Sequence, residues 1–290
     1  MELIKALRKN QELLEDIKLA NKDQTGFHLW WLGQSGFLIQ WQGKHLLIDP
    51  YLSDSLTTKY ATTEKPHVRM TELVVNPADL DFIDVVTSSH NHTDHLDGDT
   101  LIPLIKANPN IQMVVPEANL DFVANRLKMD KEFFIGLNDK EKTELSGFTI
   151  SGIPAAHEQL ERDEKGCCRF MGYVIQFGSF SIYHSGDTIW HEDIVDALKH
   201  FEIDVAILPI NGSDPKRKVA GNLNSQEAVR LGKVVNAKVV IPCHYDMFTF
   251  NTADPEEFVK EAELKGQACK VMQCGERWSS TELTELWNDK

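Results

Sequence analysis

The sequence has no long hydrophobic run, few cysteines and no excess of basic residues. Its 290 residues include 30 Lys and Arg against 44 Asp and Glu, which gives a formal net charge of −14. Nucleic-acid backbones and anionic membrane surfaces are bound by clustered positive charge, so neither is expected as the main partner. The N-terminus lacks an uninterrupted apolar stretch and no later run is long enough to span a bilayer. The sequence therefore predicts a cytoplasmic protein.

The five cysteines favour reduced thiols over disulfides, because their number is odd. Cys167 and Cys168 are adjacent, which is awkward geometry for a bridge between them. Cys269 and Cys274 are too far apart for a Cys-x-x-Cys redox pair. Cys243 is expected to be a small buried residue that ends a strand.

Length and composition predict one globular body. A chain of 290 residues is near the upper limit for a single hydrophobic core, and 42% hydrophobic residues suffice to fill it. Residues 1–25 are predicted to form an amphipathic helix packed on that body, and residues 26–290 to form the domain itself. The helical prediction rests on apolar residues that share faces, namely Leu3, Ile4 and Leu7, and Leu13, Leu14 and Ile17.

Three histidines and an aspartate lie within six positions, in the segment His90-Asn91-His92-Thr93-Asp94-His95. Residues 82–87 before it resemble a buried strand, and Asp99 or Thr100 after it is a candidate N-cap of a helix. Strand, loop and helix in this order place a site at the carboxyl edge of a sheet. The alternative is a polar surface turn that binds nothing, which a lone histidine would favour. Four ligands at this spacing indicate a metal site.

Matching ligands follow three other predicted strands. His157 follows residues 148–154, Asp187 lies shortly after residues 180–183, and His244 follows residues 238–242. Each is a weak signal by itself. Together they supply the ligands from other strand ends that a metal site on the 90–95 loop requires.

These ligand motifs, taken together, resemble those of the metallo-β-lactamase-fold hydrolases. Within that superfamily, residues 31–37, 208–212 and 241–246 are most similar to the group around L-ascorbate-6-phosphate lactonase, and the resemblance extends from Phe27 to Trp278. It implies a single-domain α/β (α+β) fold, built as a four-layer αββα sandwich. It also implies that His90, His92 and His157 hold one metal ion, that Asp94, His95 and His244 hold another, and that Asp187 bridges them.

Two such ions can share a water molecule, lower its pKa from about 15.7 towards 7 and polarise a substrate oxygen. Imidazole and carboxylate ligands suit Zn²⁺, Mn²⁺ or Fe²⁺, and the resemblance favours Zn²⁺ or Mn²⁺. Asp94 can both bind a metal ion and accept a proton as the nucleophile attacks, so it is the predicted catalytic residue.

Two residues are predicted to support the ligands from behind. The resemblance places the Asp49 carboxylate behind the ligand loop, where it would fix the tautomer of a metal-bound histidine. A turn carboxylate before Pro50 is an equally simple interpretation. His184 and Glu158 flank ligands, and packing at a strand end is the commoner role for such residues.

Substrate contacts are predicted at three positions. Gln34 lies in a turn that the family places near the cleft. Arg217 belongs to the only compact basic cluster near a predicted site edge, Lys216-Arg217-Lys218, and would either hold a phosphate or lie on a solvated loop. Asn222 either faces the site or belongs to a helix-capping turn. Residues 51–80 carry few periodic signals, and a loop of this length is expected to roof the site.

The predicted function is hydrolysis of a lactone or related ester by a metal-bridged hydroxide, with a sugar-phosphate lactone as the specific substrate. A phosphodiesterase is the alternative, because the same metal pair stabilises phosphoryl displacement and N-acyl phosphatidylethanolamine phospholipase D has a similar motif. A metal-stabilised binding protein without turnover would lack a ligand or Asp94, and none is missing. The expected partner is a small phosphorylated or otherwise anionic molecule, and homo-oligomers are common in the family.

Overall fold

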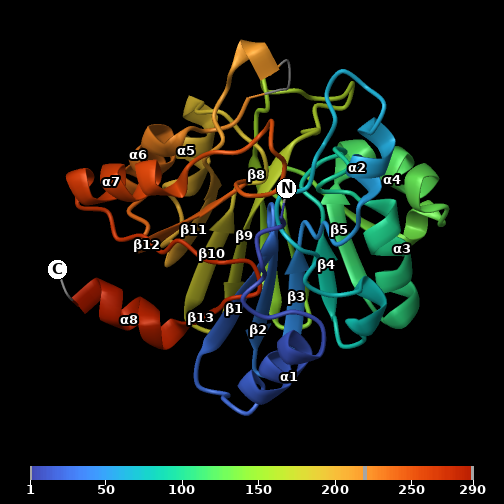
Figure 1. Ribbon diagram of the computed structural model, residues 1–290, viewed down its shortest axis with the longest axis horizontal. Coiled ribbons are helices and arrows are strands. Elements are labelled where there is room, and N and C mark those ends of the chain that lie inside the picture. The colour runs from blue at the N-terminus through green and yellow to red at the C-terminus, as the bar shows by residue number, and fades with distance from the viewer. Residues whose placement is uncertain (1, 218–220, 289–290) are drawn as a thin grey trace.

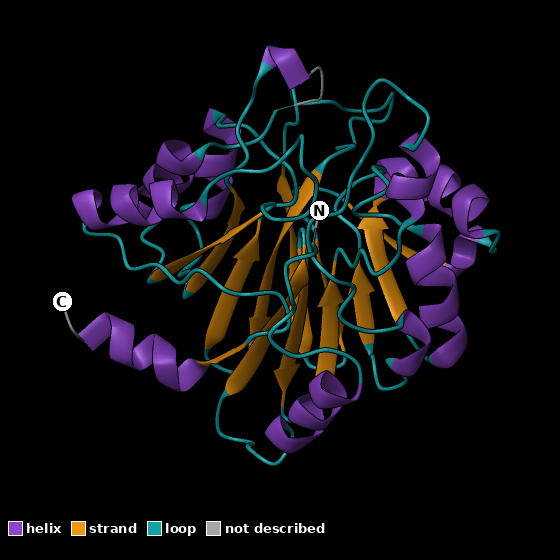
Figure 2. Ribbon diagram, in the orientation of Figure 1, coloured by secondary structure: helices purple, strands orange, loops and turns teal. Residues whose placement is uncertain are grey.

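Two β-sheets pack against each other at the centre of the molecule, and helices cover both outer sides (Figures 1 and 2). The computed structural model describes residues 2–217 and 221–288. This arrangement confirms the predicted four-layer αββα sandwich in a single domain. Among the described residues, no helix combines the length and the apolar character that crossing a membrane requires.

The first sheet has seven strands in the order β13-β1-β2-β3-β4-β5-β6. The pairs from β13 to β3 are antiparallel and those from β3 to β6 are parallel. The bounds are Phe27–Gly33 (β1), Gly36–Trp41 (β2), Lys44–Ile48 (β3), Val85–Thr87 (β4), Gln112–Pro116 (β5), Phe134–Leu137 (β6) and Arg277–Ser279 (β13).

The second sheet has six strands in the order β12-β11-β10-β9-β8-β7. Here β12, β11 and β10 are parallel, and the remaining pairs are antiparallel. The bounds are Lys142–Leu145 (β7), Phe148–Pro154 (β8), Met171–Phe177 (β9), Phe180–His184 (β10), Val205–Pro209 (β11) and Val239–Cys243 (β12).

Eight α-helices and four short 3₁₀ helices occur among the described residues. The α-helices are Gln11–Ala20 (α1), Ser55–Tyr60 (α2), Gly98–Ala107 (α3), Leu120–Leu127 (α4), Glu192–Leu198 (α5), Ser225–Val234 (α6), Pro255–Lys265 (α7) and Ser280–Asn288 (α8). The 3₁₀ helices are Pro77–Asp79 (η1), Glu117–Asn119 (η2), Lys131–Phe133 (η3) and Pro215–Arg217 (η4). In Figure 1, α3 and α4 flank the first sheet, and α5, α6 and α7 flank the second.

Aromatic side chains join the two sheets. Phe27 of β1 meets Phe177 of β9 edge to face, with ring centroids 5.7 Å apart, and Trp41 of β2 meets Phe148 of β8 at 6.4 Å. Such pairs add about 0.5–1.5 kcal/mol beyond the burial of their surface. The aromatic and β-branched residues that predict strands in residues 27–49 are therefore the residues that hold the sheets together.

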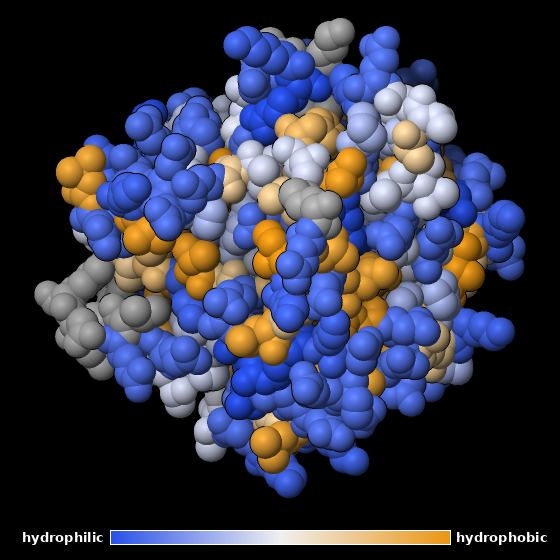
Figure 3. Space-filling model, viewed as in Figure 1, coloured by the Kyte–Doolittle hydropathy of each residue, from blue (hydrophilic) through white to orange (hydrophobic). Residues whose placement is uncertain are grey.

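The N-terminal prediction is partly wrong. Helix α1 begins only at Gln11, and residues 3–7 are extended, because Ile4 pairs with the chain around Thr71: its N–H donates to Met70 O at 2.7 Å. Leu3, Ile4 and Leu7 are exposed, whereas Leu13 and Ile17 of α1 are buried. This segment crosses the middle of the face shown in Figure 3, where hydrophobic residues are visible around it and the periphery is mostly hydrophilic.

The start of one helix also differs from the prediction. Helix α3 is capped by Asp97, not by Asp99 or Thr100, because the Asp97 carboxylate accepts hydrogen bonds from the Asp99 N–H and the Thr100 hydroxyl. All five cysteines are free thiols, as predicted.

The buried side chain of His45 on β3 predicts a pH-dependent stability. Burial lowers the pKa of His45 to about 4, and Gln40 Nε2 lies 2.9 Å from its Nε2. In the unfolded chain a histidine titrates near 6.5, so below that pH the unfolded state binds a proton that the folded state does not. We therefore expect His45 to reduce the free energy of unfolding by about 2 kcal/mol between pH 7 and pH 5.

Urea unfolding of the His45→Gln variant at both pH values measures this effect. The variant has no titrating group at this position. Between pH 7 and pH 5 its free energy of unfolding should therefore fall by about 2 kcal/mol less than that of the unmodified protein. His200→Gln changes an exposed histidine and is the matched control. An unchanged pH dependence in His45→Gln would contradict the prediction.

Candidate metal centre

The ends of four strands converge on one site between the sheets. The segment of residues 90–95 follows β4, and His157 follows β8. Asp187 follows β10, and His244 comes directly after β12. Because the carboxyl ends of parallel strands lie at one edge of a sheet, β4 of one sheet and β10 and β12 of the other deliver these residues to the same place. The structure thus brings together all seven residues predicted as ligands.

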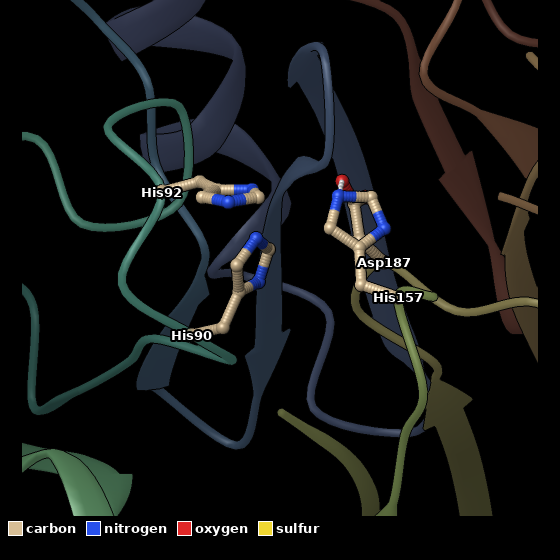
Figure 4. Close-up of side chains that lie close together, drawn as sticks. All are labelled: His90, His92, His157 and Asp187. Atoms are coloured by element: carbon tan, nitrogen blue, oxygen red, sulfur yellow. Dashed lines mark ion pairs between the residues drawn. The ribbon is translucent and has the colours of Figure 1, made fainter. Parts of the chain in front are cut away.

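These residues form two groups. His90, His92, His157 and Asp187 each offer one ligand atom within 4.8 Å of the others, and Asp94, His95 and His244 do the same. Figure 4 shows the imidazoles of His90 and His92 on one side, facing His157 and Asp187 on the other. All members are at least partly buried except His92, whose side chain is exposed.

The Asp187 carboxylate contacts both groups. Its Oδ2 lies 3.5 Å from His157 Nε2 of the first group and 3.5 Å from His244 Nε2 of the second. Its Oδ1 lies 3.3 Å from His95 Nε2. A carboxylate in this position can bridge two metal ions, one held by each group.

The donor atoms fit metal ions. His90 Nε2, His95 Nε2 and Asp187 Oδ1 are buried without a hydrogen-bond partner among the described residues; the last two atoms lie 3.3 Å apart, but not in hydrogen-bonding geometry. Buried polar atoms without partners are unfavourable, and a bound metal ion would satisfy all three of these atoms. The set is imidazole nitrogen and carboxylate oxygen, which suits Zn²⁺, Mn²⁺ or Fe²⁺. Cys243 comes directly before the ligand His244 but belongs to neither ligand group, so the set contains no thiolate.

The protonation states of most of the ligand side chains also fit a metal site. Desolvation by the surrounding protein, together with the neighbouring His157, lowers the pKa of His92 to about 4 although part of this residue stays exposed to solvent; burial holds the pKa of His90 well below its usual value, so both imidazoles are neutral at pH 7. Burial alone would raise the pKa of Asp187, but the neighbouring His95 and His244 outweigh it and hold this pKa well below 3.8. His90, His92 and Asp187 are thus in the forms that bind metal ions, whereas Asp187 and Asp94 raise the pKa of His95 well above its usual value against the effect of burial, so a metal ion would have to displace a proton from His95.

Hydrogen bonds from behind orient two of the histidines. Asp49 Oδ2 lies 2.7 Å from His95 Nδ1, and both side chains are fully buried. The Ser89 N–H donates to Asp49 Oδ1 at 2.9 Å and the Ser89 hydroxyl donates to Oδ2. His157 Nδ1 lies 2.7 Å from the carbonyl oxygen of Gly221. Each acceptor places the proton on Nδ1 and leaves Nε2 free for a metal ion.

Gln34 and His184 lie behind the ligands rather than on the cavity wall. Gln34 is fully buried; its Nε2 donates to Asp94 Oδ2 at 2.8 Å and lies 3.0 Å from His244 Nε2. The predicted substrate contact of Gln34 is therefore replaced by a contact with two ligands. His184 accepts from the Gly186 N–H and donates from Nε2 to the carbonyl of Ser35, which fixes its tautomer.

The two other predicted substrate residues lie in different places. Asn222 is buried and lines the cavity above the ligands. The Arg217 guanidinium does not line this cavity, because its Nη1 donates to Asn251 Oδ1 at 2.9 Å and its Nη2 to Asn211 O at 2.5 Å. Lys218 of the predicted basic cluster lies outside the described residues.

A cavity of about 310 Å³ opens above the ligands. The segment of residues 51–80 lines it, as predicted for a roof, with Leu56, Lys59, Tyr60 and His67. The remaining wall residues outside the ligand set are Asn91, Thr93, Arg126, Asn222, Phe248, Phe250 and Asn251. The cavity therefore combines two cations, Lys59 and Arg126, with an aromatic side and several amides.

The sequence analysis missed Arg126. This α4 residue lines the cavity, and its Nη1 donates to the carbonyls of Asn91 at 2.6 Å and Leu96 at 3.1 Å, which ties the two ends of the ligand loop together. The guanidinium carbon of Arg126 lies over the ring of Phe122, 4.4 Å from the ring centroid. A single arginine on an amphipathic helix carries no sequence signal of such a role.

Gly186, next to Asp187, packs so closely against neighbouring residues that a larger residue there should destabilise the protein. Gly186 has φ of +60°, and a Cβ there would lie 2.7 Å from both Met171 O and Ser89 Cβ. Gly186→Ala should lower the free energy of unfolding by about 2–5 kcal/mol, from the left-handed backbone and the overpacking together. The matched control is Gly166→Ala, at φ of +83° with nothing within 4 Å of a Cβ, which should lose only about 1–2 kcal/mol. Urea unfolding measures both, and equal losses would contradict the prediction.

Comparisons with known proteins agree with this geometry. A family model described as a beta-lactamase superfamily domain matches residues 28–244. A UPF0173 metal-dependent hydrolase from Methanosarcina mazei is 30% identical over 239 residues, which are 81% of this chain and 90% of that protein. A probable L-ascorbate-6-phosphate lactonase from Escherichia coli O139:H28 is 25% identical over 287 residues, 89% of this chain and 80% of that protein. The predicted similarity to the lactonase group is thus present, but it is weaker than the similarity to the UPF0173 protein.

A solved structure shows the same fold. A possible metal-dependent hydrolase from Veillonella parvula superposes with a TM-score of 0.67 at 19% identity, over 88% of this chain and 99% of that chain.

Proposed function

Since this chain belongs to the beta-lactamase superfamily, and within it to the UPF0173 metal-dependent hydrolases, we propose that it opens a lactone or related ester at a centre of two metal ions. The observation that carries this proposal is the position of Asp187, whose carboxylate contacts both ligand groups at the base of the cavity. The metal ions proposed are Zn²⁺ or Mn²⁺, with Fe²⁺ as the alternative.

When bound, the two ions supply a water molecule that is deprotonated at neutral pH and a Lewis acid for the substrate carbonyl. The protein residues orient the reacting groups and accept the proton that is released. Gln34 Nε2 donates to Asp94 Oδ2 and fixes the orientation of that carboxylate. We assign to Asp94 the role of accepting a proton as the nucleophile attacks, because it is a carboxylate among the ligands that also lines the cavity.

The cavity wall supports a sugar-phosphate lactone as the specific substrate. Lys59 and Arg126 can neutralise an anionic group, and the amides of Asn222 and Asn251 can hydrogen-bond hydroxyl groups. In this proposal the phosphate lies near Lys59 and Arg126, in place of the Arg217 contact expected from the sequence.

A phosphodiesterase is the second candidate, and the aromatic side of the cavity favours it. Tyr60 stacks on His67 with ring centroids 4.3 Å apart, and Phe248 and Phe250 lie 5.1 and 4.6 Å from the same imidazole. This wall fits an apolar substituent, which a lipid or aryl phosphodiester would carry.

Elemental analysis and a chelation assay test both candidates. Protein purified without added metal is expected to hold about two divalent ions per chain, and a lactone panel and bis(p-nitrophenyl) phosphate are assayed before chelation, after it and after metal is restored. Chelator-sensitive lactone opening would support the main proposal. Cleavage of the phosphodiester alone would support the second candidate, and failure to bind divalent metal after reconstitution would overturn both.

A further inference from the structure

The side-chain oxygen of Asn222 is a buried acceptor without a partner. Asn222 is 2% exposed and lines the metal-centre cavity, and its Oδ1 has no hydrogen-bond partner among the described residues. The backbone of this residue is fixed, because its N–H donates to Gly212 O at 3.2 Å and the preceding residue, Gly221, accepts from the metal ligand His157. A buried acceptor held beside the ligands and left unpaired points to a donor on the substrate.

A chain of side-chain hydrogen bonds runs from Arg217 to Asn222. Arg217 Nη1 donates to Asn251 Oδ1 at 2.9 Å, and Asn211 Nδ2 donates to the same oxygen at 3.0 Å. Asn211 Oδ1 in turn accepts from Asn222 Nδ2 at 3.1 Å. Four residues are therefore linked in one network, of which Asn222 and Asn251 line the cavity and Arg217 and Asn211 lie outside its lining.

Arg217 sets the direction of this network, because a guanidinium has donors and no acceptor. Asn251 must present its oxygen to Arg217, so Asn211 meets that oxygen with its NH₂ group. The oxygen of Asn211 therefore faces Asn222, and Asn222 donates to it from its own NH₂ group. Of the two polar atoms of this side chain, Nδ2 is then bonded to Asn211 and Oδ1 is the atom left without a partner.

We propose that Asn222 Oδ1 accepts a hydrogen bond from a hydroxyl group of the substrate, and that Arg217 is the positioning residue that orients it through Asn251 and Asn211. This inference rests on the proposed lactone hydrolysis and specifies its substrate class: a lactone that carries a hydroxyl group, bound through that hydroxyl at Asn222. The fixed direction of the network excludes a phosphate or carboxylate oxygen at this point, since those groups only accept.

The test compares a hydroxylated substrate with one that lacks the hydroxyl. Hydrolysis of α-hydroxy-γ-butyrolactone, β-hydroxy-γ-butyrolactone and γ-butyrolactone is measured for the metal-loaded protein. At least one hydroxylated lactone is expected to show kcat/KM about three- to tenfold above γ-butyrolactone, the contribution of one hydrogen bond. In Asn222→Leu this preference should disappear.

Arg217 provides variants that do not alter the cavity wall. Arg217→Met removes the donor that orients Asn251, so the amides can rotate and the preference should fall by at least half. Arg217→Lys keeps a group that only donates and should retain more of the preference. Metal content and melting temperature are measured for each variant, because a purely structural role would lower these without changing the ratio between the two substrates.

Binding of the ring-opened acids separates this inference from the proposed function. Affinities for 2,4-dihydroxybutyrate, 3,4-dihydroxybutyrate and 4-hydroxybutyrate are measured by calorimetry. A preference for a dihydroxy acid that Asn222→Leu abolishes would support the inference even if no lactone is hydrolysed, in which case only the proposed function fails. Lactone hydrolysis without any hydroxyl preference, or a preference that survives Asn222→Leu, would overturn the inference and leave the proposed function standing.

Discussion

Replacing Asp187 with Asn should reduce kcat/KM by about 10³-fold or more, since the metal pair supplies several kcal/mol of transition-state stabilisation and tenfold in rate corresponds to about 1.4 kcal/mol. Asp187 is the residue that contacts both ligand groups, with His157 and His244 each 3.5 Å from its Oδ2. An amide keeps the shape of the side chain but loses the negative charge and one of the two oxygens. The metal content should fall from about two ions per chain to one or fewer.

Elemental analysis and kinetics on the same preparations measure this effect. Asp196→Asn is the matched control, because the Asp196 carboxylate is exposed on α5 and pairs with Lys199 at 2.8 Å. The control should retain both metal content and activity. An Asp187→Asn protein with two tightly bound ions and unimpaired activity would remove the basis for a shared carboxylate.

Asp49→Asn has the second largest expected effect, although Asp49 is not itself a predicted ligand. The N–H of Ser89 holds one oxygen of Asp49, so in the variant the NH₂ group would face His95 Nδ1. His95 would then accept at Nδ1 and carry its proton on Nε2, the atom that a metal ion needs. Metal affinity should fall about 10- to 100-fold, the usual loss when such a supporting group is removed.

Competition against a chromogenic chelator measures the affinity directly. Asp204→Asn is the control for the loss of a buried carboxylate, because Asp204 is 6% exposed and accepts from the Ser181 N–H at 2.8 Å, with Lys238 2.6 Å away. That variant should lose stability but not metal affinity. Equal metal affinities for Asp49→Asn and the unmodified protein would show that another group fixes the His95 tautomer.

Strands and metal-binding residues could be predicted because each has a local signature. The aromatic and β-branched runs of β1 to β3 and the dense 90–95 segment are readable without knowledge of the rest of the chain. The same local reasoning failed for residues 3–7, whose helical spacing is overridden by pairing with the chain around Thr71. Tertiary pairing of this kind leaves no trace in the periodicity of the segment itself.

Residues that act through backbone atoms or through other side chains were harder to place. The Gly221 carbonyl that orients His157 has no side-chain signature, and Arg126 acts on the ligand loop from a different helix. Arg217 was noticed for its charge and assigned to a phosphate, whereas its donors are used by Asn251 and Asn211. A charge in a sequence shows what a group can bind, and the fold decides which of the available partners it meets.

The distribution of the predicted ligands along the chain also has a consequence for biosynthesis. The 90–95 segment leaves the ribosome about 150 residues before His244, which at roughly 5–20 residues per second corresponds to about 8–30 s. During that interval His157 and then Asp187 are added to the three histidines and the aspartate of the segment, and the set stays incomplete until His244 is made. The complete set of predicted ligands therefore exists only after translation has passed β12, and its members come together only when both sheets have folded.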